Sequence, residues 1–145
     1  MDGKNLHSLY LPLKLTYGLV PLLAGLDKFF HILVDWTIYL PEPVANLLPV
    51  SAATFMMIVG VIEVIAGAAV LTVLTRLGAW VVMVWLIMIA VVVTVGGHLD
   101  IAVRDLALAV GAFTLAQVAA MRGEAWLPGA GHRAASGPGG RPQHA

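Results

Sequence analysis

The sequence predicts an all-α integral membrane protein, folded as a bundle of four helices. Its 145 residues are 60% hydrophobic and only 11% charged, against roughly 25% charged residues in soluble domains. Four apolar segments recur along the chain, each near the roughly 20 residues that a helix needs to cross a bilayer. Only helices can cross as single segments, because backbone groups in lipid must form hydrogen bonds within their own segment. The segments extend over about Leu9 to Phe30, Ala52 to Leu74, Leu77 to Val95 and Ile101 to Met121.

The connections between these segments differ in length. Thr75-Arg76 separates the second from the third, and a stretch that begins with Gly96-Gly97 separates the third from the fourth, so both predict tight turns. The first connection is long, from about residue 31 to 51, and holds Trp36, which favours a membrane interface. We expect it to lie along the outer surface, with a short helix around residues 44–48. The first segment is expected to be retained rather than cleaved.

The chain ends in a tail that is rich in glycine and proline, from Arg122 onward. We expect a transmembrane domain over residues 1–121 and a disordered tail over 122–145. The distribution of Lys and Arg predicts that both termini are cytoplasmic, in a bacterial-type inner membrane. The inner side would carry Lys4, Lys14, Arg76, Arg122, Arg133 and Arg141, and the outer side Lys28 and Arg104.

Glu63 is an ionisable residue near the middle of the second apolar segment. It shares a helical face with Gly60 and Gly67, where small residues let another helix approach, so it is expected to point into the bundle. A carboxyl group at that depth is costly and suggests function. Two interpretations remain open: a structural acid that forms hydrogen bonds across helices, or a site that handles protons or a quinone.

The first segment carries further polar side chains. Tyr17 is expected near the middle of the bundle, where its hydroxyl could reach Glu63, and Pro21 should kink the helix. Lys14 and Lys28 are expected to extend toward opposite membrane surfaces, as long cationic side chains do in membrane helices.

Charged residues gather at the predicted outer ends of the first and fourth helices. Asp27 and His31 are four residues apart, as are Asp100 and Arg104, so each pair could touch on a helix. Asp105 begins a stripe of alanines and is expected to face the bundle. The cluster is either a network of salt bridges or a pocket for a lipid headgroup or quinone, with a histidine that exchanges protons.

His31 and His98 also raise haem or metal binding as alternatives. The sequence gives both little support, because neither histidine lies well inside an apolar segment and no tight ligand spacing occurs. Cysteine is absent, which excludes thiolate catalysis and Cys-ligated iron–sulfur clusters. The net charge of +0 provides no basic field that would favour nucleic acid.

Short motifs that combine small and ionisable residues occur in three of the apolar segments: YGLVP at 17–21 with GLDKF at 25–29, GVIE at 60–63 with Gly67, and RDLAL at 104–108. Together they resemble the DoxX-like family of small four-helix membrane proteins, over about residues 9–121. The resemblance implies a membrane partner of redox proteins more than a stand-alone enzyme. It assigns Asp27, Glu63, Arg104 and Asp105 to the family's polar positions.

The expected function is therefore that of an integral membrane subunit or anchor in a quinone-linked redox complex. Its partners would be the bilayer and redox protein subunits, and a homo-oligomer is compatible with the sequence. The alternative is a non-catalytic assembly protein, which would bind partners through the uncharged third helix at Leu77 to Val95. That helix, with Trp80 and Trp85, is expected to face lipid or a partner. A third option is a haem-binding electron-transfer subunit.

Overall fold

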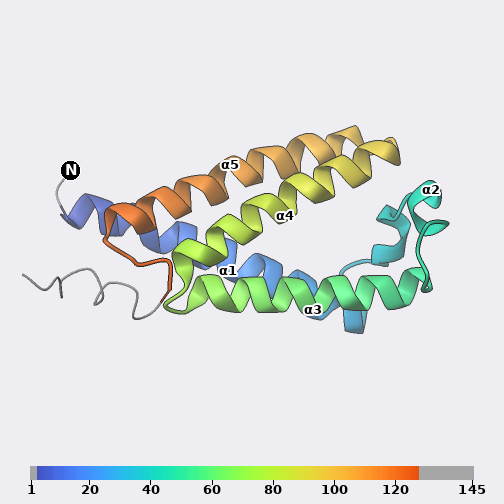
Figure 1. The fold of residues 1–145 in the computed structure, drawn as a ribbon, viewed down its shortest axis with the longest axis horizontal. Coiled ribbons are helices and arrows are strands. Elements are labelled where there is room, and N and C mark those ends of the chain that lie inside the picture. The colour runs from blue at the N-terminus through green and yellow to red at the C-terminus, as the bar shows by residue number, and fades with distance from the viewer. Residues whose placement is uncertain (1–2, 128–145) are drawn as a thin grey trace, which may run out of the picture.

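The computed structural model describes residues 3–127 and contains four long helices that run antiparallel in succession (Figure 1). All four are long and apolar enough to cross a membrane. By helix composition the chain is thus an all-α, multi-pass integral membrane protein, as the sequence predicts. The long helices are α1 (Gly3–Phe30), α3 (Ala52–Leu71), α4 (Thr75–Val95) and α5 (Leu99–Met121).

The predicted ends of these helices need small corrections. α1 begins at Gly3 rather than near Leu9, and it continues through Pro21 to Phe30 as one helix. α3 ends at Leu71, where Thr72 takes extended backbone angles and its hydroxyl donates a hydrogen bond to the Ala69 carbonyl.

The connection between α1 and α3 contains two short elements, the 3-10 helix η1 (Trp36–Tyr39) and the one-turn helix α2 (Glu42–Ala45). α2 corresponds to the short helix expected around residues 44–48, displaced toward the N-terminus. The connection folds back onto the end of the bundle, and Leu40 is buried there.

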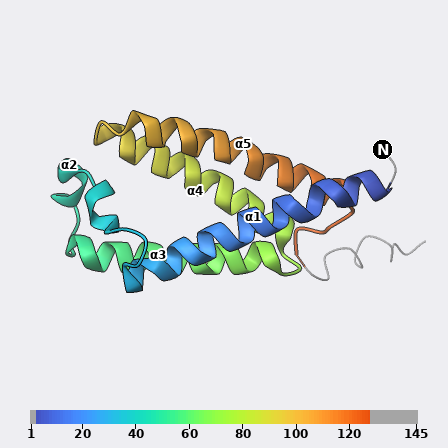
Figure 2. The ribbon, with the colours of Figure 1, turned by 180° about the vertical axis from the view of Figure 1, so that it is seen from behind.

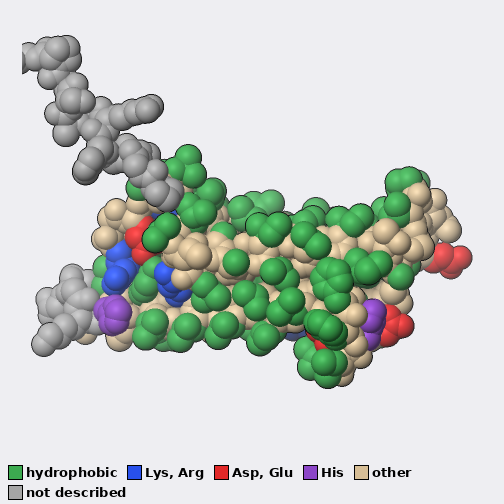
Figure 3. All heavy atoms as spheres, turned by 90° about the horizontal axis from the view of Figure 1, so that it is seen from below, with side chains coloured by type: hydrophobic (Ala, Val, Ile, Leu, Met, Phe, Trp, Pro, Cys, Tyr) green, Lys and Arg blue, Asp and Glu red, His purple; other side chains and the backbone are tan. Residues whose placement is uncertain are grey.

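The helices form two pairs, α1 with α3 and α4 with α5. Figures 1 and 2 show the pairs close together at the end with the N-terminus and spread apart toward α2. Exposed apolar side chains cover the length of the bundle, whereas charged side chains gather toward its two ends (Figure 3). This distribution suits a molecule surrounded by acyl chains along its length.

Glycines bring α1 and α3 into close contact. A Cβ added to Gly60 would lie 2.7 Å from the Gly25 carbonyl oxygen, and one added to Gly25 would lie 2.6 Å from the Gly60 carbonyl oxygen. One heptad along, a Cβ added to Gly67 would lie 2.5 Å from the Gly18 carbonyl oxygen, whereas one added to Gly18 would clash with the Leu71 side chain. Small residues of this kind let the backbones of membrane helices touch.

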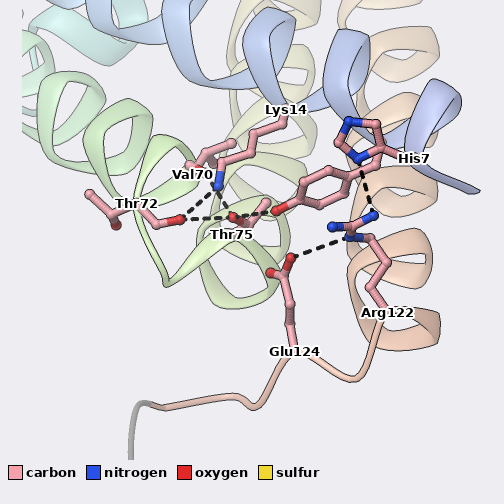
Figure 4. A network of polar contacts seen from close by, with 8 residues as sticks. His7, Lys14, Val70, Thr72, Thr75, Arg122 and Glu124 are labelled. Carbon is pink, nitrogen blue, oxygen red and sulfur yellow. Dashed lines mark hydrogen bonds and ion pairs between the residues drawn. The ribbon is translucent and has the colours of Figure 1, made fainter.

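A polar network holds together the end that carries the N-terminus (Figure 4). The Tyr10 hydroxyl donates to the Thr75 hydroxyl at 3.1 Å, and Lys14 donates to the Thr72 carbonyl at 2.9 Å. Lys14 thus extends toward this end, as predicted, and binds the turn between α3 and α4. Arg122 lies over the Tyr10 ring, 4.2 Å from its centroid.

The first residues of the predicted tail make defined contacts with this end. Arg76 donates to the Glu124 carbonyl at 3.3 Å and lies over the Trp126 ring, which stacks on Trp80. The structure therefore gives residues 122–127 defined positions in part of the segment for which the sequence predicts disorder. The remainder of that tail, 128–145, lies outside the described residues.

Candidate functional site: a polar cavity between the helix pairs

A cavity of about 490 Å³ lies where the two helix pairs spread apart. Its volume falls within the roughly 300–1,000 Å³ of typical small-molecule sites. Most of its lining is apolar and comes from all four long helices and the connection between α1 and α3. The lining residues with ionisable or hydrogen-bonding side chains include Tyr17, Lys28, Trp36, Glu63, Trp85, Arg104 and Asp105.

Lys28 and Glu63 form an ion pair in this cavity, with Nζ and Oε2 2.5 Å apart. The exposed fractions of the two side chains are only 3% and 8%. Glu63 points into the bundle, as predicted. The expectation that Lys28 extends to the membrane surface is wrong, because Lys28 lies one helical turn after Gly25, on the face of α1 that meets α3.

Two tryptophans flank the pair. The Lys28 ammonium lies 3.8 Å from the centroid of the Trp36 ring, which suits a cation–π interaction. The indole N–H of Trp85 donates to Glu63 Oε1 at a long 3.4 Å. Trp85 of α4 therefore points into the cavity. This corrects the expectation that this helix, with its tryptophans, faces lipid or a partner. Its buried face consists of Thr75, Gly78, Ala79, Val82, Ala90 and Val93.

Asp27 binds the backbone that follows the C-terminal end of α1. Its carboxylate accepts hydrogen bonds from the backbone N–H groups of Ile32 and Leu33 at 2.9 and 3.0 Å, and from the indole N–H of Trp36 at 2.8 Å. The expected Asp27–His31 pair does not form, because α1 ends at Phe30 and His31 has a φ of 52°. Asp27 instead holds η1 so that the Trp36 ring covers Lys28.

Asp35 begins η1 as its N-cap. The hydroxyl of Thr37 donates to its carboxylate at 2.7 Å, and the backbone N–H of Thr37 donates at 3.0 Å. These two hydrogen bonds favour the ionised form and hold the pKa of Asp35 below its usual value. The local charge of Asp35 therefore stabilises the segment that carries Trp36.

Asp105 faces the bundle, as predicted, with only 3% of the residue exposed. Arg104 binds it through Nε and Nη2, each 3.0 Å from the same carboxylate oxygen. The expected Asp100–Arg104 pair is thus replaced by a pair between adjacent residues. The Arg104 side chain remains 64% exposed, so it lies at the rim of the cavity.

Tyr17 also lines the cavity, but its hydroxyl does not bind Glu63. It donates to the Leu108 carbonyl at 2.8 Å and so ties α1 to α5. The close approach of the Tyr17 ring to α5 depends on Gly111, because a Cβ at that position would overlap the Tyr17 hydroxyl. The structure thus gives Tyr17 a hydrogen-bond partner other than the Glu63 that the sequence suggests.

His31 and His98 lie at the α2 end of the bundle and do not line the cavity. The ring of His98 contacts the edge of Tyr39, with centroids 6.0 Å apart. Within residues 3–127, no group of three or more His, Asp or Glu side chains is arranged to hold a metal ion.

Sequence reasoning missed three residues of this site, Lys28, Trp36 and Trp85. A signal for Lys28 was available. Gly25 precedes Lys28 by three residues, as Gly60 precedes Glu63, so the glycine contact between α1 and α3 brings the two charges together. No sequence pattern marks the two tryptophans, whose positions depend on the fold of the connection and the rotation of α4.

No family model, no curated protein and no solved structure matches this chain. A function for this chain therefore has to be inferred from the chemistry of the cavity. That chemistry consists of a buried cation and a buried anion side by side, two indole rings against them, and an apolar enclosure. Such an arrangement can donate and accept hydrogen bonds to the polar head of a lipophilic molecule.

Proposed function

We propose that this chain is an integral membrane subunit of a quinone-linked redox complex, with a quinone bound in the cavity between the helix pairs. The Lys28–Glu63 pair carries the proposal. Removing two charges from water is expensive, and ionisable groups inside membranes mark functional sites by default. A mostly apolar pocket in which a few polar groups converge is the common form of a small-molecule site.

The hydrogen-bonding capacity of the pair fits the head of a quinone. Lys28 has three N–H donors, of which one is used by Glu63. Within residues 3–127, Glu63 Oε1 receives only the long contact from Trp85. The pair can thus donate to a carbonyl oxygen through Lys28 and accept from a hydroxyl through Glu63. A bound quinone supplies a redox couple that takes up two electrons and two protons.

The charge distribution supports an inner-membrane orientation with both termini in the cytoplasm. Lys28 is neutralised by Glu63 within the bundle, so Arg104 is the remaining cation on the outer side of residues 3–127. The excess of Lys and Arg on the other side favours the cytoplasm there. Electrons would come from or go to a redox protein subunit, in agreement with the resemblance to the DoxX-like family.

The decisive experiment compares Glu63→Gln with wild type in native membranes. We expect loss of quinone binding and of quinone-linked electron transfer in complexes that still assemble, at a lowered stability of this subunit. Glu42→Gln is the matched control, because Glu42 is an exposed acid in α2 that does not line the cavity. Unchanged binding and electron transfer in Glu63→Gln would refute the redox proposal. Loss of assembly alone would favour the non-catalytic anchor.

A further inference from the structure

The exposed residues of the cavity wall lie mainly along one seam. Most lining residues are buried or half-buried, but Thr16 and Val20 of α1 and Arg104 and Leu108 of α5 are exposed as well as lining. Met88 of α4 is the one other exposed lining residue. A residue that borders the cavity and also faces outward marks an opening. The main opening therefore lies between α1 and α5.

The hydrogen bond from Tyr17 to Leu108 marks the inner limit of this opening. Beyond it, α1 and α5 diverge toward the α2 end (Figure 2). The rim is mostly apolar, since Val20 is 56% and Leu108 36% exposed, and Arg104 stands at its outer end. An apolar rim on the side of a membrane bundle faces acyl chains.

The outer end of the cavity is covered by the connection between α1 and α3. Trp36, Tyr39, Leu40 and Val44 line the cavity there, and Asp27 fixes Trp36 in place. This cover separates the cavity from the aqueous phase beyond α2. A ligand would thus reach Lys28 and Glu63 from the side more directly than from the end.

We propose that the cavity opens sideways into the bilayer between α1 and α5, and that the prenyl tail of its quinone leaves through this window. The inference rests on the proposed function. A cavity of about 490 Å³ accommodates a ring with a short substituent. A tail of many isoprenoid units exceeds that space and has to extend outside. The window is the place where it meets lipid without crossing water.

The test compares two probes that share one head: a tail-less dimethoxy-methyl-benzoquinone, and the same head with a long isoprenoid tail. Binding to the full chain in nanodiscs is followed by quenching of tryptophan fluorescence. Val20→Trp and Leu108→Trp narrow the window. The control is Val91→Trp, at an exposed position of α4 that does not line the cavity.

We expect both window variants to bind the tailed probe about tenfold to a hundredfold more weakly. This loss of affinity corresponds to the usual cost of placing extra side-chain atoms in occupied space. Val20 and Leu108 also line the cavity, so the tail-less probe is the reference for effects on the head, and its binding should weaken at least about fivefold less than that of the tailed probe. Val91→Trp should leave both affinities unchanged. Equal losses for the two probes, or no loss for either, would overturn the window. If neither probe binds to wild type, the proposed function itself fails.

A second measurement avoids bulky substitutions. The chain has no cysteine, so Val20→Cys introduces a single thiol at the window. We expect the tailed probe to slow its reaction with a lipid-soluble maleimide, whereas the tail-less probe leaves the rate unchanged. Equal rates with both probes in a variant that binds both would contradict the proposed path of the tail.

Discussion

Lys28 and Glu63 depend on each other for their burial. Each charge taken from water alone carries a desolvation cost that only a close partner of opposite charge offsets. The 2.5 Å separation supplies that partner, and Trp36 and Trp85 add weaker contacts on either side. Removing one of the two charges should therefore lower the free energy of unfolding more than removing both.

We predict that Glu63→Gln or Lys28→Met alone lowers the free energy of unfolding by about 3–5 kcal/mol, because an uncompensated charge remains buried. The double variant Lys28→Met/Glu63→Gln should recover most of this loss, while quinone binding stays abolished. Denaturant titration in detergent measures the stability of all three proteins. Additive losses in the double variant would show that the two side chains are not energetically coupled.

The sequence predicts acidic residues of this site better than their partners. The burial of Glu63 and Asp105 follows from helical periodicity, because small residues mark the face that meets another helix. The equal spacing of Gly25 from Lys28 and of Gly60 from Glu63 indicates their pairing only once α1 is known to contact α3. The role of Asp27 depends on the end of α1 at Phe30, whereas a contact between Asp27 and His31 requires the helix to continue through His31.

The contact between α1 and α3 determines the geometry of the site at the level of elements. We predict that Gly60→Ala separates Lys28 from Glu63, because its Cβ would lie 2.7 Å from the Gly25 carbonyl oxygen. An overpacked contact costs about 1–3 kcal/mol. The melting temperature and the affinity for the quinone should therefore both fall. Ala53→Val, at an exposed position of the same helix, is the control and should change neither.

The hydrogen bonds of Asp35 predict a pH dependence for the η1 segment. The folded pKa of Asp35 is lowered by its hydrogen bonds to Thr37. Its contribution to stability is therefore complete above the unfolded pKa of about 3.9 and is lost as pH falls through the lower folded value. We predict a change in Trp36 fluorescence below about pH 4. Asp35→Asn should remove this transition, and its persistence in that variant would assign it to another group.

Lengths and types of the helices follow from apolar runs, whereas their rotation about the axis does not. The four long helices lie where hydrophobic segments predict them, because the bilayer requires each segment to form its own backbone hydrogen bonds. α4 has no charged residue from Leu77 onward, so its sequence carries no sign of which face Trp85 occupies. The contacts of Trp126 with Trp80 and Arg76 likewise join segments that no periodicity relates.

At the scale of the whole molecule, four antiparallel helices bring the N-terminal part of α1 and the C-terminal end of α5 to the same end of the bundle (Figure 1). That end holds Lys14, Arg76 and Arg122, and the opposite end holds the η1–α2 connection. The difference in positive charge predicts that the first of these ends faces the cytoplasm.

Cysteine labelling in intact cells tests this orientation, because the chain contains no native cysteine. Leu47 after α2 and Val73 in the turn between α3 and α4 are 84% and 74% exposed, at opposite ends of the bundle. We predict that a membrane-impermeant maleimide labels Leu47→Cys in whole cells, whereas Val73→Cys reacts only after the membrane is opened. The reverse pattern would invert the orientation. Labelling of both from outside would contradict the four-span topology, since the single helix α3 has to carry the chain from one face of the bilayer to the other.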